Sequence, residues 1–126
     1  MPRTRGGGSG MADTHEVVER YFRALEKGDL RAMLECFSED AVLIQVDCVV
    51  HGRRAIAKEL VRNLRGVFAP GTYKRVRDSF RVHGELAHLV WHAECLGTHI
   101  PHGVTTFVVR DGLITGVTYA VEAQPV

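Results

Sequence analysis

The chain has 126 residues, of which 16 are basic and 15 acidic, and its formal net charge is +1 at pH 7. This length fits one domain with its own core, and so balanced a charge gives no strong field to capture nucleic acid or an anionic membrane. No apolar run approaches the roughly 20 residues that span a bilayer. We therefore expect a single globular domain with no nucleic-acid or membrane partner.

The beginning of the chain differs in composition from the rest. Residues 1–10 are rich in Gly and poor in apolar side chains, so they bury too little surface to offset the entropy of ordering. We predict a disordered leader over residues 1–12 and a single folded domain over residues 13–126.

Helical spacing is strongest near the N-terminus. Asp13 and Glu16 have the form of a capping box, so the first helix is predicted to begin near Asp13. Gly28 is a good helix stop, and Asp29 is a good N-cap for a short second helix. The first helix has its apolar stripe at Val17, Val18, Tyr21, Phe22 and Leu25, and the second has its buried set at Leu30, Met33, Leu34 and Phe37.

Strand patterns dominate the rest of the chain. Residues 38–40 are predicted to form a loop, residues 41–50 a strand, and residues 53–65 a third helix. Four further strands are expected over 72–82, 86–96, 103–109 and 113–121, the last two joined by a hairpin turn at Arg110-Asp111-Gly112. Helices first and antiparallel strands afterwards indicate an α+β fold.

Four segments in this order resemble motifs of one superfamily. Residues 21–30 (YFRALEKGDL) resemble its Y-x-x-A-x-x-x-G-D helix junction, 37–42 (FSEDAV) its F-x-x-D-A strand entry, 51–56 (HGRRAI) its x-G-R-x-A-I helix start, and 107–114 (FVVRDGLI) its F-x-x-x-D-G-x-I hairpin. The superfamily includes nuclear transport factor 2, ketosteroid isomerase and SnoaL-like polyketide cyclases. The resemblance covers residues 13 to about 122. It implies a cone-shaped α+β barrel: a curved antiparallel sheet wrapped around a long N-terminal helix, with two further helices.

The resemblance also suggests which residues carry chemistry. Tyr21 matches the oxyanion-hole Tyr of ketosteroid isomerase, but Gln45 stands where that family has its base Asp, and Thr105 where it has a protonated Asp. Since one role of three is kept, steroid isomerisation by that mechanism is rejected. Gly97-Thr98-His99 resembles a G-T-H segment of the cyclases, whose H-W-x-x-x-D segment is not kept near Glu122.

Strand alternation predicts which side chains face the interior. The expected inward sets are Leu43, Gln45 and Asp47; Leu89, Trp91, Ala93 and Cys95; Thr105, Phe107 and Val109; and Val117, Tyr119 and Val121. We take Tyr21 and Asp47 as catalytic candidates. Candidates for binding substrate are Gln45, Trp91, His99, Thr105, Phe107 and Tyr119.

Each of these candidates has a structural alternative. Tyr21 either donates to a carbonyl oxygen or oxyanion or is a buried Tyr bonded to Asp47, Gln45 or Tyr119. Asp47 is either a general base with a raised pKa or a solvated residue at the end of a strand. His99 either reaches the cone mouth as an acid or base or lies in a hairpin turn. Trp91 and Phe107 are either core residues or a platform for a ligand.

The remaining titratable clusters are interpreted as surface features. The basic group Lys74, Arg75 and Arg77 is predicted to be a solvated face. His88 and His92 lie about 13 Å apart on a strand at roughly 3.3 Å per residue, so one metal cannot bind both. His99 and His102 have no evident third ligand, so no metal site is expected.

Two classes of function remain open. The first is a cofactor-independent isomerase, dehydratase or cyclase that moves a proton on a small apolar, carbonyl-containing or polyketide-like molecule. The second is a non-catalytic ligand-binding or dimerisation module. The resemblance implies a homodimer through the convex sheet face, with His88, Val90, His92 and Glu94 as contributors. The odd count of three Cys argues against a disulfide framework, so the cytoplasm is the expected compartment.

Overall fold

The computed structural model describes residues 6–125, with side chains described from Asp13 onward. Its helices are α1 (Gly6–Lys27), α2 (Leu30–Glu35) and α3 (Arg53–Arg65). Its strands are β1 (Phe37–Gln45), β2 (Val49–His51), β3 (Tyr73–His83), β4 (Leu86–Cys95), β5 (Thr98–Arg110) and β6 (Leu113–Pro125). The expected α+β class, with three helices and one curved sheet, is confirmed.

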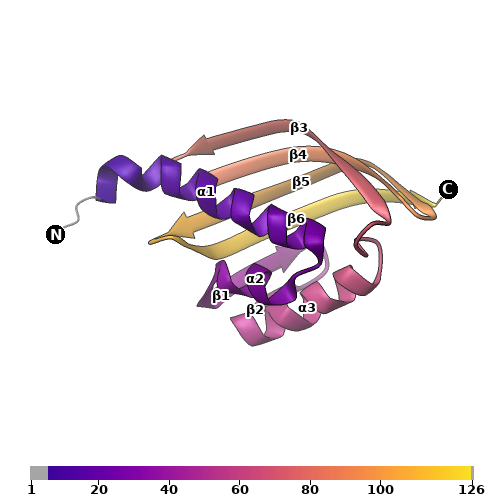
Figure 1. Cartoon of the computed structure of the whole chain (residues 1–126), viewed down its shortest axis with the longest axis horizontal. Coiled ribbons are helices and arrows are strands. Elements are labelled where there is room, and N and C mark those ends of the chain that lie inside the picture. The colour runs from indigo at the N-terminus through magenta and orange to yellow at the C-terminus, as the bar shows by residue number, and fades with distance from the viewer. Residues whose placement is uncertain (1–5, 126) are drawn as a thin grey trace.

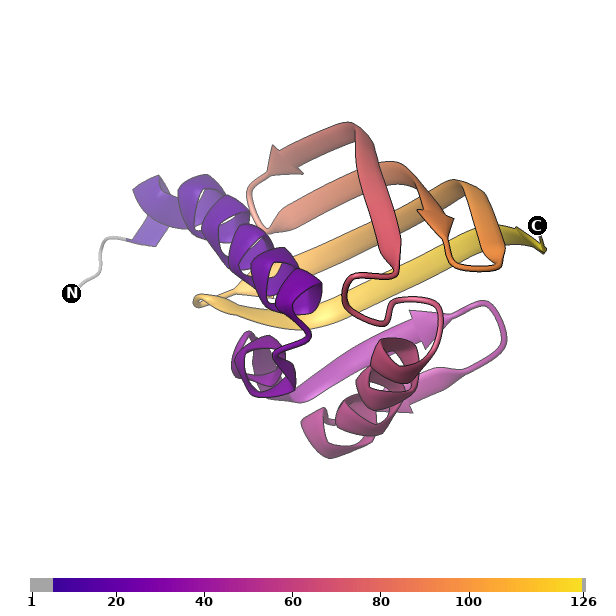
Figure 2. The same cartoon turned by 45° about the vertical axis from the view of Figure 1, so that its right-hand side comes forward.

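The strands form one sheet in the order β2-β1-β6-β5-β4-β3. The sheet curves over α1, while α2 and α3 lie beside β1 and β2 (Figure 1). Turned by 45°, the molecule shows all three helices on the same side of the sheet (Figure 2). Because its inner face is covered and its outer face is not, the sheet has the alternating burial pattern of a half-buried surface, most regularly in β4 and β5.

Two details of the sheet correct the prediction. The β1 and β6 strands run parallel, so the sheet is mixed and not wholly antiparallel. The sheet is also open, because β2 and β3 are its edges, so it is not a closed barrel. A parallel pair arises because β1 and β6 are distant in sequence and no hairpin turn constrains their direction.

The element boundaries differ from the prediction in several places, among them the earlier start of β5 at Thr98 and the later end of β6 at Pro125. The α1 helix begins at Gly6, so Asp13 lies inside it and is not its N-cap. The predicted leader includes residues 1–5, which lie outside the described residues, and the division into leader and domain stays a prediction. Residues 38–40, predicted as a loop, belong to β1, which carries an irregularity between Phe37 and Val42. The strand predicted over 41–50 is interrupted by a turn between β1 and β2.

The junction between α1 and α2 forms as its sequence predicts. Gly28 has a φ of 71°, a conformation that glycine adopts readily, and a Cβ there would lie 2.4 Å from Cγ of Pro70. The Asp29 side chain accepts a hydrogen bond of 3.1 Å from the Ala32 amide and so caps α2. This sharp turn lets α1 cross the sheet while α2 packs next to β1.

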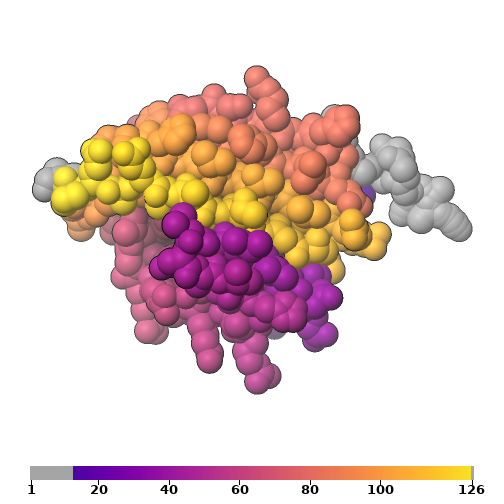
Figure 3. All heavy atoms as spheres, turned by 180° about the vertical axis from the view of Figure 1, so that it is seen from behind, coloured from indigo at the N-terminus to yellow at the C-terminus, as the bar shows by residue number. Residues whose placement is uncertain are grey.

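The core lies between α1 and the concave face of the sheet. Its largest fully buried side chains are Phe37, Phe107, Met33, Ile56, Leu89, Ile100 and Ile114. In the N-terminal half of α1, Thr14 connects the helix to the turn between β3 and β4. Its Oγ1 donates a hydrogen bond of 2.7 Å to the backbone carbonyl of Gly84. The opposite face of the sheet carries no helix in the described part of the chain; seen from behind, strand residues of β5, β6 and β1 form much of the surface (Figure 3).

Candidate functional site

A small cavity lies between α1, α3 and the concave face of the sheet, and its volume is about 60 Å³. It is lined by Tyr21, Phe22, Leu25, Leu43, Gln45, Leu60, Asn63, Phe68, Arg75, Trp91, Thr105, Phe107, Val117 and Tyr119. Ligand pockets usually hold roughly 300–1,000 Å³, and one water molecule in the liquid occupies about 30 Å³. The cavity therefore has room for a small ligand group, and a larger ligand requires side chains to move.

Tyr21 projects from α1 into this cavity. Its ring packs edge-on against Phe37 and Phe107, with ring centroids 5.5 and 5.8 Å away. Burial raises the pKa of its phenol well above the ordinary value, and the Arg75 charge opposes this rise. Within the described residues its hydroxyl makes no hydrogen bond. The alternative in which Tyr21 is tied to Gln45, Asp47 or Tyr119 is therefore wrong, and the hydroxyl is available to a ligand.

Two other polar side chains of the lining already have partners within the protein. Gln45 donates from Nε2 to Glu59 on α3 at 2.9 Å. Thr105 accepts a buried hydrogen bond of 3.1 Å from Nε1 of Trp91. These bonds hold β1 against α3 and fix the Trp91 ring. The N–H donors of Gln45 and Trp91 are therefore already used within the protein.

Trp91 and Tyr119 stack to form one aromatic wall. Their ring centroids lie 6.4 Å apart with an interplanar angle of 21°. Burial raises the pKa of Tyr119 to about 12, with a smaller contribution from Cys95. With Phe107, these rings line the cavity from the sheet, as the alternation in β4, β5 and β6 predicted. Their role in binding a ligand stays a prediction.

Asp47 does not reach the cavity, and the expectation that it shares a face with Gln45 is wrong. It lies exposed in the turn between β1 and β2. In this turn the backbone N–H of Gln45 donates a hydrogen bond of 2.9 Å to the backbone carbonyl of Cys48. The strand ends at Gln45, so alternation no longer applies two residues later. No other carboxylate replaces it among the described residues of the cavity wall.

His99 lies outside the described cavity lining as well. It sits near the start of β5, where its Nδ1 pairs with Glu94 of β4. A register irregularity between His99 and His102 places Ile100 in the core and leaves His99 half-buried. His88 is exposed, and His92 pairs with Asp78 at 2.9 Å.

Arg75 is the charged cavity residue that the sequence prediction missed, as it also missed Asn63 and Phe68. It was placed on a solvated face, yet its side chain is only 5% exposed and lines the cavity from β3. Its guanidinium carbon lies 4.1 Å from the ring centroid of Phe22, and its Nη2 lies 3.2 Å from Glu26. Burial lowers the pKa of this guanidinium, whereas Tyr73 and Glu26 act in the opposite direction. The missed signal was alternation in β3, which puts residues 73, 75 and 77 on one face.

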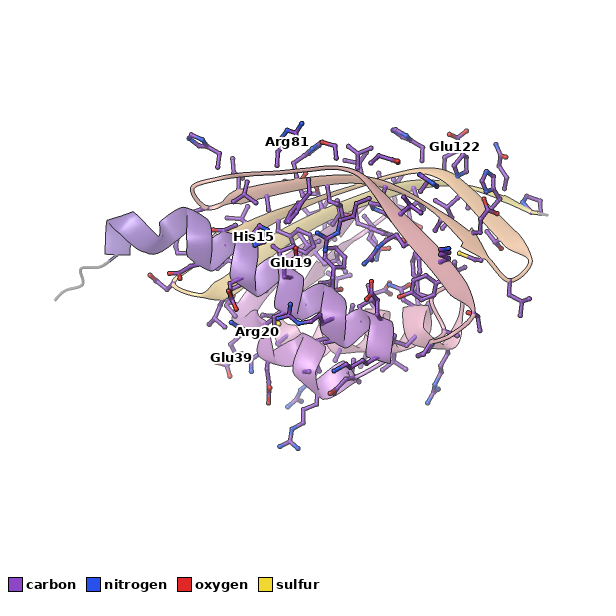
Figure 4. The ribbon with its side chains drawn as sticks, turned by 45° about the horizontal axis from the view of Figure 1, so that its top comes forward. His15, Glu19, Arg20, Glu39, Arg81 and Glu122 are labelled. Atoms are coloured by element: carbon purple, nitrogen blue, oxygen red, sulfur yellow. The ribbon has the colours of Figure 1, made fainter. Side chains whose placement is uncertain are left out.

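Charged contacts also connect α1 to β3 outside the cavity. Glu19 of α1 accepts two hydrogen bonds from the guanidinium of Arg77, and Figure 4 shows Glu19 with His15 on the sheet side of the helix. Arg81 and Glu122, in contrast, point away from the helix on the outer side of the sheet (Figure 4). Arg77 is therefore part of the helix–sheet contact, whereas Arg75 goes deeper and meets the cavity.

The described residues show no metal-binding cluster and no membrane-spanning helix. They contain no group of three His, Cys, Asp or Glu that could hold a metal ion. None of their helices is both long and apolar enough to cross a bilayer.

The arrangement defines a cone-shaped α+β domain whose cavity offers hydrogen-bond donors in apolar surroundings. Residues 18–117 match the model of the SnoaL-like domain, and the chain belongs to this family. A comparison with curated proteins finds no significant match.

Several solved structures share the fold. A candidate ketosteroid isomerase from Kribbella flavida has a TM-score of 0.74 at 18% identity, covering 89% of this chain and 79% of that one. A candidate polyketide cyclase from Xanthomonas campestris has a TM-score of 0.69 at 25% identity, covering 90% and 93%. An NTF2-like protein of unknown function from Mesorhizobium loti has a TM-score of 0.74 at 20% identity, covering 97% of each chain. These likenesses show the shared fold, and leave the activity to the site.

Proposed function

We propose that this SnoaL-like domain binds a small, mainly apolar molecule with an oxygen acceptor, such as a carbonyl group, inside its cone. The observation that carries the proposal is the Tyr21 hydroxyl, which lines the cavity and makes no hydrogen bond within the described residues. A hydroxyl that faces a mainly apolar cavity without a protein partner gains free energy when it meets an acceptor there. A ligand oxygen would satisfy it, while the Trp91, Phe107 and Tyr119 rings would cover the ligand's apolar part.

Trp91 provides a direct test, because it is the only Trp in the chain and lines the cavity. Butanone, a small neutral ketone, should change Trp91 fluorescence in a saturable manner. Tyr21→Phe should weaken this binding about tenfold, the value of one good hydrogen bond. Tyr73→Phe is a matched control, since its buried hydroxyl also lacks a partner within the described residues but lies outside the cavity lining. Absence of any saturable change in wild type would refute the proposal.

Cofactor-independent proton transfer is a second candidate: isomerisation, dehydration or cyclisation of an apolar carbonyl or polyketide-like compound. Tyr21 favours it, because a phenol in a dry site stabilises a developing oxyanion. The described lining supplies no carboxylate base, so we rank binding above catalysis. Turnover of a substrate panel should fall in Tyr21→Phe and stay unchanged in Asp47→Asn. Loss of turnover in Asp47→Asn would restore the catalytic role that the sequence suggested for Asp47.

We further propose that two chains pair through the outer face of the sheet and that the protein acts in the cytoplasm. The expected contributors His88, Val90, His92 and Glu94 lie on the face of β4 opposite Leu89 and Trp91. The three cysteines are free, which suits a reducing compartment.

A further inference from the structure

Arg75 is the only ionised side chain in the described cavity wall. Its side chain is 5% exposed, whereas its one hydrogen-bond partner among the described residues, Glu26, is 59% exposed. An Arg guanidinium carries five N–H donors, and the bond from Nη2 to Glu26 uses one of them. The cation is therefore buried, while its counter-charge stays in contact with solvent.

A buried guanidinium whose counter-charge is exposed to solvent favours the binding of an additional anion. Burying a charge is costly unless hydrogen bonds and an opposite charge compensate it. One ring, Phe22, covers a face of the guanidinium and leaves its in-plane N–H groups free to donate. Arg75 also lines a neighbouring hollow of about 220 Å³ formed with Glu26, Gly71, Tyr73 and Lys74.

The hydroxyls around Arg75 point to the same conclusion. Tyr21 and Tyr119 line the cavity with it, and the charge of Arg75 acts on both phenols. The Tyr73 hydroxyl, in the adjacent hollow, is buried and makes no hydrogen bond within the described residues. The surroundings of Arg75 thus hold several donors and no buried anionic acceptor.

We propose that Arg75 is a specificity-determining residue that binds the carboxylate of a small organic acid, whose apolar part lies against the aromatic wall of the cone. This inference rests on the proposed function, since it names the chemical class of the ligand in the same cavity. A carboxylate fits because it is planar, carries one charge and accepts two parallel bonds from a guanidinium. A phosphate group is bulkier and more highly charged, and suits a cavity of about 60 Å³ with mainly apolar walls less well.

The competing interpretation is a structural one, in which Arg75 only joins β3 to α1 through Phe22 and Glu26. It predicts that removing the Arg75 charge lowers stability without changing the preference among ligands. Binding and stability must therefore be measured on the same variants.

Butyrate, butyramide and butanone are suitable probes, because the first two differ mainly in charge and the third tests the cavity without either group. Wild type should bind butyrate about tenfold or more tightly than butyramide, as followed by Trp91 fluorescence. Arg75→Gln should abolish this preference and leave butyramide and butanone within about twofold of wild type. Glu26→Gln should strengthen butyrate binding, because it removes a competing carboxylate.

Arg77→Gln is the matched control, since it removes a charge two residues along the same strand but outside the described cavity lining. It should keep the preference for butyrate. Thermal unfolding of each variant reports folding, and if Arg75→Gln does not fold, Arg75→Lys and Glu26→Gln carry the test. Butanone binding with equal affinities for butyrate and butyramide overturns this inference alone. No response of Trp91 to any probe overturns the proposed function and the inference together.

Discussion

Tyr119 combines aromatic stacking with a phenol that resists ionisation. Burial raises its pKa from 10.0 to about 12. The folded state thus holds the phenolic proton more tightly than the unfolded state, so this stabilisation is complete below pH 10 and is lost as pH rises from about 10 to about 12. At about 1.4 kcal/mol per pKa unit, the loss is about 3 kcal/mol.

Urea unfolding at pH 9, 10, 11 and 12 checks this expectation. Wild type should lose about 3 kcal/mol more than Tyr119→Phe across the interval, because the variant has no phenol to ionise at this position. Both proteins contain the same Lys residues and the same Tyr21, so their difference isolates Tyr119. Parallel pH curves for the two proteins would show that Tyr119 ionises normally in the folded state.

The sequence predicts a cavity-lining residue correctly only where that residue lies within a regular helix or strand, so that helical spacing or strand alternation applies to it. Trp91, Thr105, Phe107 and Tyr119 lie in long strands, and alternation placed them on the inner face. Asp47 lies beyond the last residue of β1, where the turn removes the period of two. Arg75 was missed for another reason: a charged side chain is usually exposed, and nothing in the local sequence shows that Phe22 of α1 lies over it.

At the scale of elements, β4 and β5 hold the aromatic wall through an unusually close contact. Gly103 of β5 pairs with Trp91 of β4, and a Cβ at position 103 would lie 2.5 to 2.8 Å from three atoms of the indole ring. The indole can lie flat on β5 only because Gly103 has no side chain. The same packing allows the Trp91 bond to Thr105 two residues further along β5.

Gly103→Ala should therefore displace the indole. We expect a loss of about 2–4 kcal/mol in unfolding free energy from strain and a broken buried hydrogen bond, a shift in Trp91 emission, and loss of butanone binding. Gly116→Ala in β6 is the control, because its added Cβ would meet Val108 at an ordinary 3.9 Å. Equal stability and emission in the two variants would contradict the proposed packing.

Element boundaries were predictable where strong turn residues stand. The hairpin between β5 and β6 turns at Asp111 and Gly112, both with positive φ, as the Asp-Gly pair predicted. The turn between β1 and β2 contains neither Gly nor Pro and interrupts a run of β-branched residues, so the sequence showed one strand where the structure has two.

At the scale of the whole molecule, the order of helices and strands was sufficient to predict the curved α+β fold, since helices on one side of a sheet must cover its apolar face. Strand order is a different matter. The parallel pairing brings the first strand, β1, next to the last strand, β6. Only the packing of the whole core determines which strands become neighbours in this way. Local patterns carry no such information, so the mixed sheet could not be predicted from them.

The outer face of this sheet leads to the prediction at molecular scale. Val76 and Leu86 are 42% and 52% exposed there, and Val90 lies opposite Val104 on the same face. An apolar patch without a covering helix in the described part of the chain is a suitable surface for a second copy. Light scattering at neutral pH should therefore give twice the chain mass for wild type.

Val90→Lys should shift the protein to the monomer, because two-fold pairing would bring charged side chains into an apolar contact. Ligand binding should remain, since Val90 and the cavity residue Trp91 lie on opposite faces of β4. The control is Val46→Lys, at a position 84% exposed in the turn between β1 and β2 and away from the outer patch. A monomeric wild type would refute the predicted dimer. Equal dissociation of both variants would show that the outer patch is not the specific contact between the two chains.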